Sequence, residues 1–320
     1  MYLADVPLPS SCPGTLPETF RESVWFARCW TLQELLAPRR LTFYTQGWVI
    51  LGNITKSTYG SWSNGPSAIE AEVASITRIS DGALTEKRFG FRTSVAQKMS
   101  WAAGRRATRP EDVAYSLLGL FDVNMPLLYG EGHRAFTRLQ HEIIRQSNDD
   151  SIFAWRIREH ADCSLHQTDL DTFRSVCLAD CCHGSLVAPS PQFFRESGGV
   201  MQAGRTVYGR PYSITNRGLE MVADCESVRD VQLDYGTLFV MPLHCFQMVD
   251  GVERPCRLAL IGRDQYDKAD STAPLDLSAA DHVVVGERAH CCDLGDKIPV
   301  LYPPDDRSRV GTKRFYVPVR

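Results

Sequence analysis

Glu34 is the residue whose surroundings most readily suggest chemistry. It ends the stretch Trp30-Thr-Leu-Gln-Glu34, and Trp25 lies a few residues upstream. A partly desolvated carboxylate can stabilise positive charge that develops on a bound ligand during a reaction. Trp25 and Trp30 would then supply apolar walls for the bound ligand. Glu34 is therefore the leading candidate for a catalytic residue.

The same spacing has a purely structural interpretation. Thr31-Leu-Gln-Glu34 fits the capping box, in which the threonine oxygen accepts the third helical amide and the glutamate reaches back to the cap's own amide. This predicts a helix that begins at Leu32 and lasts about two turns, because Pro38 disfavours helical geometry at Ala37. From the local sequence alone, capping is the favoured role of Glu34.

A glycine-rich stretch, Gly130-Glu-Gly-His-Arg-Ala135, superficially matches the dinucleotide-binding fingerprint. That fingerprint needs a preceding strand inside a βαβ unit, whereas the sequence before it is helical and then contains Met125-Pro126. We therefore interpret the glycines as turn and helix-capping residues.

The eleven cysteines are interpreted as reduced thiols, because their number is odd and no secretion signal is visible. A zinc site is one hypothesis for a group of cysteines and histidines in the second half of the chain. The residues concerned are Cys177, Cys181, Cys182, His183, His290, Cys291 and Cys292. They lack the paired C-x2-C spacing of common structural zinc sites, so we expect no metal.

The elements around Glu34 suggest a small α/β part. Residues 1–6 have the pattern of the end of a strand, and Leu41–Tyr44 alternates like a second strand. A strand, helix and strand in this order are typical of a βαβ unit. Residues 48–51 suggest a further short strand that ends at Gly52-Asn53.

A helical region is predicted next. Ser94-x-x-Gln97 is a second capping box, and Pro110 suits the first turn of another helix. Apolar residues at helical spacing predict helices over residues 69–79, 94–103, 108–121 and 133–146. The doublets Arg39-Arg40 and Arg105-Arg106 are interpreted as solvated helix ends.

From about residue 185 the pattern changes to short apolar runs separated by turns, which favours an antiparallel sandwich or barrel. The predicted strands cover residues 212–215, 219–222, 237–246, 257–262, 282–285, 298–302 and 314–319. We therefore expect an α+β (mixed) chain. Its parts are an α/β domain over residues 1–60, a helical region over 61–150 and an antiparallel β-rich domain over 151–320.

Three stretches of the chain resemble a known family. Trp30–Pro38, Ser94–Ala103 and Asp112–Gly132 resemble, in this order, the fungal heterokaryon-incompatibility (HET) domain and the region that follows it. The resemblance covers residues 1–155 closely, and the remainder looks like the β-rich extension that often follows such domains. Compared with the family, the chain looks N-terminally truncated, since the first strands and helices of the domain have no counterpart before Met1.

The residues from Trp30 to Leu35 also resemble a signature of TIR domains, to which the HET domain is distantly similar and which cleave NAD. The resemblance implies that residues 1–60 are a partial TIR-like α/β remnant. It also implies that Glu34 is the catalytic glutamate, with Trp25 and Trp30 beside the cofactor. NAD would then be a substrate, and no other cofactor is implied.

The role implied by the HET resemblance is self/non-self recognition that leads to programmed cell death. Three mechanisms stay open. The chain is an interaction module that self-associates or joins full-length HET-domain proteins, or it is a TIR-like NAD hydrolase that acts on assembly, or it is an inactive fragment of a longer gene product. The first predicts an exposed apolar sheet edge near residues 2–6 or 41–44, and the second predicts an open cleft at Glu34.

Composition narrows the range of partners. The net charge of -3 offers no concentrated basic face for nucleic acid, and a hydrophobic fraction of 43% is ordinary for a globular protein. No stretch approaches the apolar length needed to cross a bilayer, and the first residues lack the pattern of a signal peptide. We therefore expect a cytoplasmic protein that binds neither nucleic acid nor membrane.

Overall fold

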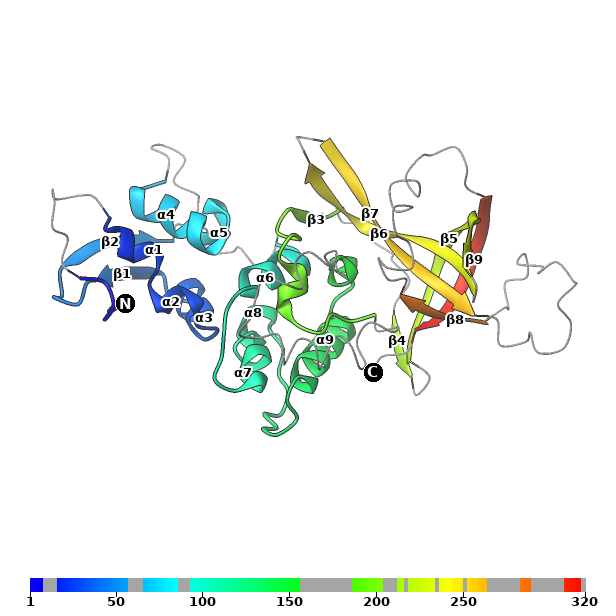
Figure 1. The fold of residues 1–320 in the computed structure, drawn as a ribbon, viewed down its shortest axis with the longest axis horizontal. Coiled ribbons are helices and arrows are strands. Elements are labelled where there is room, and N and C mark those ends of the chain that lie inside the picture. The colour runs from blue at the N-terminus through cyan, green and yellow to red at the C-terminus, as the bar shows by residue number, and fades with distance from the viewer. Residues whose placement is uncertain are drawn as a thin grey trace, which may run out of the picture. The chain divides into compact units, whose positions relative to one another are not determined.

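The computed structural model divides the chain into two compact units, whose elements are shown in Figure 1. It describes residues 1–7, 16–56, 66–85, 93–155, 186–203, 212–215, 218–233, 236–249, 252–263, 283–288 and 308–317. The N-terminal unit comprises Met1–Leu139 and Ser190–Gly198, and the C-terminal unit comprises Gln140–Pro189 and Gly199–Arg320. The domain limits at residues 60 and 150 stay a prediction.

The N-terminal unit begins with three short helices and a hairpin. These elements are α1 (Glu18–Arg21), α2 (Val24–Ala27), α3 (Thr31–Leu36), β1 (Arg40–Tyr44) and β2 (Ile50–Thr55). Residues 1–3 pair in parallel with β1, since the Leu3 amide donates to the Tyr44 carbonyl (2.9 Å) and the Tyr44 amide to the Met1 carbonyl (2.8 Å). The predicted strand–helix–strand order is thus present in a minimal form.

Strand β2 extends further than the sequence suggested. It pairs antiparallel with β1 and continues through Gly52, which lies opposite Phe43, to Thr55. The predicted end at Gly52-Asn53 is therefore wrong, because Gly52 has an extended backbone here (φ 158°) and lies close against Ile69. Phe43 of β1 also belongs to an aromatic cluster, in which the rings of Phe20 and Trp25 each pack edge-on against Phe26 and Phe43.

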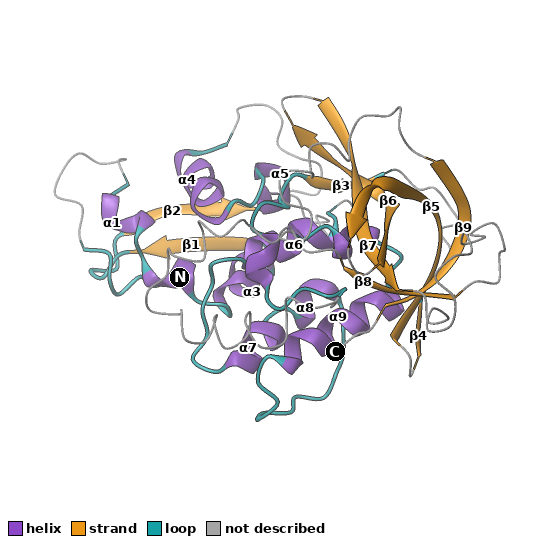
Figure 2. Cartoon of the chain, turned by 45° about the vertical axis from the view of Figure 1, so that its right-hand side comes forward, coloured by secondary structure: helices purple, strands orange, loops and turns teal. Residues whose placement is uncertain are grey.

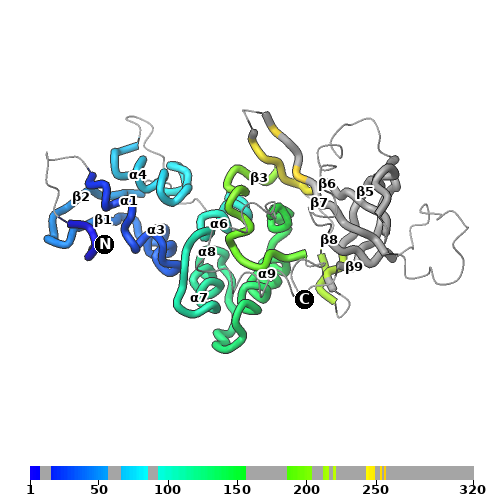
Figure 3. The backbone as a smooth tube through the Cα atoms, in the orientation of Figure 1, coloured from blue at the N-terminus to red at the C-terminus, as the bar shows by residue number. Residues whose placement is uncertain are grey.

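Capped helices follow in the N-terminal unit. Helix α4 (Ala68–Thr77) begins with a capping box of Ser67 and Glu70, and α5 (Asp81–Thr85) follows it. Helix α6 (Val95–Ala102) begins with the predicted box of Ser94 and Gln97, which confirms that prediction. The 3-10 helix η5 (Pro191–Phe194) packs against α6, and Figure 3 shows this later segment as a light green tube beside it.

The helix predicted over residues 108–121 is two helices, α7 (Pro110–Tyr115) and α8 (Leu118–Phe121). Pro110 occupies the first turn as expected. At the junction the Gln33 side chain donates to the Ser116 carbonyl, and Gly119 lies so close to Gln33 that an added Cβ would stand 3.1 Å from its Oε1 atom. Close packing of α3 on the junction accounts for the break. Helix α9 (Arg134–Gln146) follows as predicted.

The C-terminal unit is rich in strands, which Figure 2 shows in orange. Its described elements are η2 (Asp150–Phe153), β3 (Val200–Gln202), β4 (Ser213–Thr215), β5 (Gly218–Leu233), β6 (Gly236–Val249), β7 (Val252–Arg263), β8 (Val283–Arg288) and β9 (Ser308–Val317). The strands form a seven-stranded sheet in the order β3-β6-β7-β8-β9-β5-β4, in which β5 also pairs with β6. This extra pairing closes five strands, β5 to β9, into a ring like that of a small barrel.

The ring is not wholly antiparallel. Strand β8 pairs in parallel with β9, whereas the other described pairings are antiparallel. The predicted strand at 298–302 lies outside the described residues. The chain is therefore α+β (mixed), as expected. Within the described residues, none of the helices has both the length and the apolar character that crossing a membrane would require.

Candidate functional site

The predicted capping box at Thr31 does not form. Helix α3 begins at Thr31, with Trp30 as its N-cap and no side-chain cap. The Thr31 hydroxyl instead lies within hydrogen-bond distance of the Trp25 carbonyl (2.5 Å) and the Arg28 carbonyl (2.8 Å). The helix still ends before Pro38, as predicted, since Leu36 is its last residue. Glu34 therefore does not cap the helix, although its spacing from Thr31 suggested that it would.

The three predicted site residues have different surroundings. Glu34 is exposed, and its carboxylate makes no hydrogen bond or ion pair with the described residues. Trp30 is 40% exposed and lies one helical turn before Glu34, so both belong to the same face of α3. Trp25 is only 8% exposed and packs on Phe26 and Phe43. A ligand beside Glu34 could thus reach Trp30, while Trp25 supports the helix from the core.

A second feature of the N-terminal unit is a group of exposed apolar and aromatic side chains, which we call the hairpin patch. It consists of the exposed residues Tyr2, Trp48, Val49 and Ile50 and the half-buried Tyr44. Trp48 stacks on Tyr2 with 4.7 Å between ring centroids and lies 5.8 Å from Tyr44. Trp48 is 67% exposed and Ile50 is 61% exposed. Tyr2, Tyr44 and Trp48 thus form one aromatic cluster, and the exposed Val49 and Ile50 follow Trp48 directly in the chain.

The turn that carries the hairpin patch is held by Thr45, which is completely buried. The Thr45 amide donates to the Val49 carbonyl (2.9 Å), and the Thr45 hydroxyl accepts the Val49 amide (3.2 Å). Trp48 has a positive φ of 62°, a conformation that is unfavourable for a bulky side chain. The fold thus holds Trp48 outward in a strained conformation, which the sequence pattern did not reveal.

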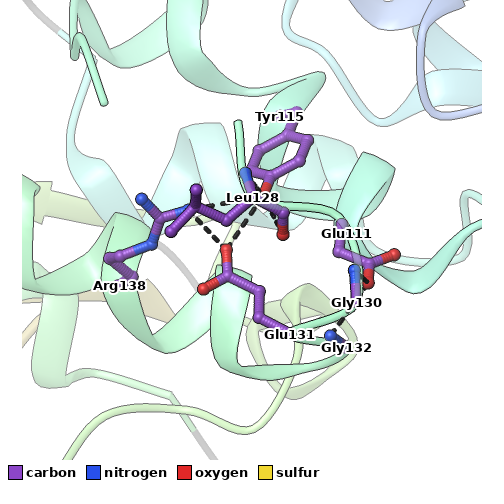
Figure 4. A network of polar contacts seen from close by, with 7 residues as sticks. All are labelled: Glu111, Tyr115, Leu128, Gly130, Glu131, Gly132 and Arg138. Carbon is purple, nitrogen blue, oxygen red and sulfur yellow. Dashed lines mark hydrogen bonds and ion pairs between the residues drawn. The ribbon is translucent and has the colours of Figure 1, made fainter. Parts of the chain in front are cut away.

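The glycine turn belongs to a network that Figure 4 shows from close by. One carboxylate oxygen of Glu111 accepts the amides of Gly130 (2.8 Å) and Gly132 (2.9 Å). Gly130 and Gly132 both have positive φ, at 102° and 60°. Because these amides are already bound by a carboxylate, they cannot cradle a pyrophosphate. The interpretation of the glycines as turn residues is confirmed.

The other half of the network fixes the loop before the turn. The Tyr115 hydroxyl accepts the Leu128 amide (2.8 Å) and lies 2.8 Å from the Glu131 carboxylate, which also pairs with Arg138. Burial, and then the neighbouring Glu131, raise the pKa of Tyr115. Leu128 itself is 54% exposed. The network is thus a structural tie rather than a reactive site.

In the C-terminal unit a buried carboxylate joins two elements. Asp150, at the start of η2, accepts hydrogen bonds from the Tyr212 hydroxyl (2.5 Å) and the His244 amide (2.9 Å). Its carboxylate also lies 2.7 Å from the His244 Nδ1 atom. Burial, and then Asp150, raise the pKa of Tyr212. Among the described residues no group of His, Cys, Asp or Glu is arranged to hold a metal. The cysteines and histidines of the zinc hypothesis lie outside the described residues.

Comparison with known proteins relates part of the chain to fungal incompatibility proteins. The chain is 36% identical over 136 residues to the vegetative incompatibility protein HET-E-1 of Podospora anserina. The match covers 42% of this chain and 9% of that relative, so the chain spans a small part of its length. Residues 134–219 match the model of a domain of unknown function, DUF8212. No solved structure matches.

Proposed function

From the relation to a vegetative incompatibility protein, we propose that the chain is an interaction module of fungal vegetative incompatibility. In this role it acts in the cytoplasm during self/non-self recognition that leads to programmed cell death. It associates with further copies of itself or with full-length HET-domain proteins. The single observation that carries the interaction role is the hairpin patch.

The position of the hairpin patch differs in detail from the sheet edge that the sequence suggested. Leu3, Val6, Leu41 and Phe43 are all buried. The exposed surface is instead formed by Tyr2, by Trp48 and Val49 before β2, and by Ile50 at the start of β2. Apolar side chains gathered on one surface of a soluble protein commonly mark a binding site. Aromatic residues are also enriched at the centres of protein interfaces, where they contribute most of the binding energy. These properties support association through this surface.

The test is the mass of the purified chain in solution over a range of concentrations, measured by light scattering after gel filtration. We expect the wild-type mass to rise with concentration. Trp48→Asn should abolish the rise, because it removes the ring while asparagine tolerates a left-handed backbone. Leu127→Asn is the matched control, since Leu127 is also exposed (53%) but lies outside the patch. A monomeric wild type, or association unchanged by Trp48→Asn, would contradict the proposal.

A second function, NAD cleavage on assembly, is favoured by the state of Glu34. Its carboxylate is exposed, makes no hydrogen bond or ion pair with the described residues and shares a helix face with Trp30. Such a carboxylate is free to hold ribose hydroxyls and to stabilise positive charge as nicotinamide leaves. An active site completed between copies would make activity depend on protein concentration.

NAD consumption by the purified chain tests this second function. We expect activity that increases faster than protein concentration and is lost in Glu34→Ala. Glu22→Ala, at another exposed glutamate, should leave the activity unchanged. Absence of NAD loss in all three proteins, with folding verified by circular dichroism, would eliminate it. If the wild type also stayed monomeric, the remaining hypothesis would be an inactive fragment of a longer gene product.

A further inference from the structure

Two exposed arginines lie side by side where the residues before α3 meet the residues after α6. Arg28 and Arg106 form a parallel β-bridge. The Arg106 amide donates to the Ala27 carbonyl (2.6 Å), and the Cys29 amide donates to the Arg106 carbonyl (2.9 Å). Partners in such a bridge project to the same side, so two like charges stand next to one another, which is unfavourable. Neither arginine forms an ion pair with a described residue.

A third arginine, Arg105, precedes Arg106 in the chain and binds the Arg28 carbonyl. The Arg105 guanidinium donates from Nε to the Trp101 carbonyl (3.0 Å) and from Nη1 to the Arg28 carbonyl (3.0 Å) and the Thr31 hydroxyl (3.0 Å). The interpretation of Arg105 as a solvated helix end is therefore wrong. Burial lowers the pKa of Arg105 to about 10, so the group still carries its full charge at neutral pH.

Arg105 has no carboxylate partner among the described residues, and its Nη2 atom is buried without a hydrogen-bond partner. A buried charge without a counter-ion is costly. A structural role as a tie between α6 and the start of α3 explains the bonds from Nε and Nη1. It does not explain the unpaired Nη2 atom or the neighbouring like charges of Arg28 and Arg106.

We infer that Arg28 and Arg106, with the buried charge of Arg105 against the Arg28 carbonyl, form a binding site for the pyrophosphate group of a small molecule. Guanidinium groups present parallel N–H donors that match the oxygens of phosphate, and several such groups match the several oxygens of a pyrophosphate. The bound anion would neutralise the like charges of the bridge. Because the whole chain has a net charge of -3, this local excess of positive charge is not part of a generally basic surface.

The site would be selective for the phosphate part of its ligand. Free pyrophosphate or the diphosphate of a nucleotide could fill it. For a nucleotide, the exposed ring of Trp30, two residues after Arg28, is a candidate contact for the base. The inference does not depend on either proposed function. Inorganic pyrophosphate lacks the bond that Glu34 would cleave, and its binding can be measured on a chain that does not self-associate.

The test is isothermal titration calorimetry of the full chain with inorganic pyrophosphate, ADP and adenosine. We expect pyrophosphate and ADP to bind, adenosine not to bind, and affinity to fall as salt concentration rises. Arg28→Gln and Arg106→Gln should each weaken binding by about tenfold or more, because each removes one charge-assisted contact. If only ADP binds, the ligand is a nucleotide; equal binding of pyrophosphate and ADP identifies the phosphates alone as sufficient.

The matched control is Arg39→Gln. Arg39 also belongs to an arginine doublet, is exposed and forms no ion pair with the described residues. The variant should bind like the wild type. No binding of pyrophosphate or ADP by the folded wild type, or equal weakening by Arg39→Gln, would overturn the inference. Arg105→Lys keeps the charge but not the planar fork, so it should weaken binding even if its melting temperature equals that of the wild type.

Discussion

At the scale of single residues, Glu111 shows how one side chain fixes a turn that two glycines make possible. The amide of Gly132, Glu111's own amide and the amide of Gly130 all lower the pKa of Glu111, in that order of size. Each of these bonds is stronger to a carboxylate than to a carboxylic acid. The charged form of Glu111 therefore stabilises the folded chain.

The sign of the pH effect follows from this lowered pKa. Between the folded pKa and the ordinary value near 4.5, the unfolded chain binds more protons than the folded chain. The contribution of Glu111 is thus fully present above the ordinary pKa and is lost as pH falls through the lowered folded pKa. We expect Glu111→Gln to lower the melting temperature at pH 7, with a difference from the wild type that shrinks towards zero in acid.

Thermal unfolding monitored by circular dichroism at a series of pH values would measure this difference. Glu22→Gln provides the control, because Glu22 is exposed and its substitution should change the melting temperature little at any pH. A deficit in Glu111→Gln that stays constant down to pH 2 would show that charge on Glu111 is not what holds the turn.

The sequence predicted the turn but not the residue that holds it. Gly130 and Gly132 are recognisable because positive φ suits glycine, whereas Glu111 precedes them by 19 and 21 residues. Pairings at such distances leave no local pattern. The same reason explains the failure at Thr31, whose hydroxyl is drawn to the Trp25 carbonyl six residues earlier. Its spacing to Glu34 was compatible with a cap that the tertiary structure does not use.

At the scale of elements, the capping boxes show how far local patterns reach. The box of Ser94 and Gln97 formed as predicted, and the equivalent box of Ser67 and Glu70 could have been found by the same rule. Helix α7 began at its proline, but its predicted continuation into α8 failed where Gln33 of α3 binds the Ser116 carbonyl. The starts of these helices could thus be predicted from neighbouring residues. The break between α7 and α8, which lies at a contact with the distant helix α3, could not.

Ser94→Ala should lower the free energy of unfolding by about 1 kcal/mol, because it removes the acceptor for the first turn of α6. The bond from the Gln97 amide to the Ser94 hydroxyl is 3.1 Å long, and Ser94 is only 2% exposed, so water cannot readily replace it. Urea denaturation of the two proteins would give the difference. Ser75→Ala, which removes an exposed hydroxyl inside α4 together with the solvent-exposed hydrogen bond that it accepts from Arg21 (3.3 Å), should change stability by less than about 0.5 kcal/mol.

The strands illustrate the same limit. Alternating apolar runs located the strands that the structure describes between residues 213 and 317, but they gave no indication that β8 pairs in parallel with β9. Strand location depends on local side-chain pattern, whereas pairing partners depend on contacts between distant segments. The sequence accordingly predicted a sandwich or a barrel without deciding between them, and the pairing of β5 with β6 closes the ring.

At the scale of the whole molecule, the chain's division does not follow sequence order. Residues 190–198 belong to the N-terminal unit, although residues on both sides belong to the C-terminal unit. Gln97 of α6 donates to the Gly198 carbonyl (3.2 Å), and Phe194 of η5 is completely buried. The sequence could not reveal that residues 190–198 return to the N-terminal unit, because the short apolar run in this segment resembles the runs of the strands that follow it.

This arrangement predicts that two substitutions only eight residues apart destabilise different units. Phe194→Ala should destabilise the N-terminal unit by about 3 kcal/mol, and Leu186→Ala, at an equally buried residue, should destabilise the C-terminal unit by a similar amount. Hydrogen exchange read by mass spectrometry separates the two. We expect Phe194→Ala to raise exchange in α6 and Leu186→Ala to raise it at residues 150–155, where the Trp155 indole donates to the Leu186 carbonyl (2.9 Å).

The pattern of exchange decides the assignment because neighbouring residues of one structural unit would respond together. If Phe194→Ala and Leu186→Ala increased exchange in the same peptides, residues 186 and 194 would belong to one cooperative unit and the return of the chain to α6 would be refuted. If the effects separate, residues 190–198 contribute to the folding of the N-terminal unit. Any shortened version of the HET-like region would then need this segment to keep α6, and with it Arg105, in place.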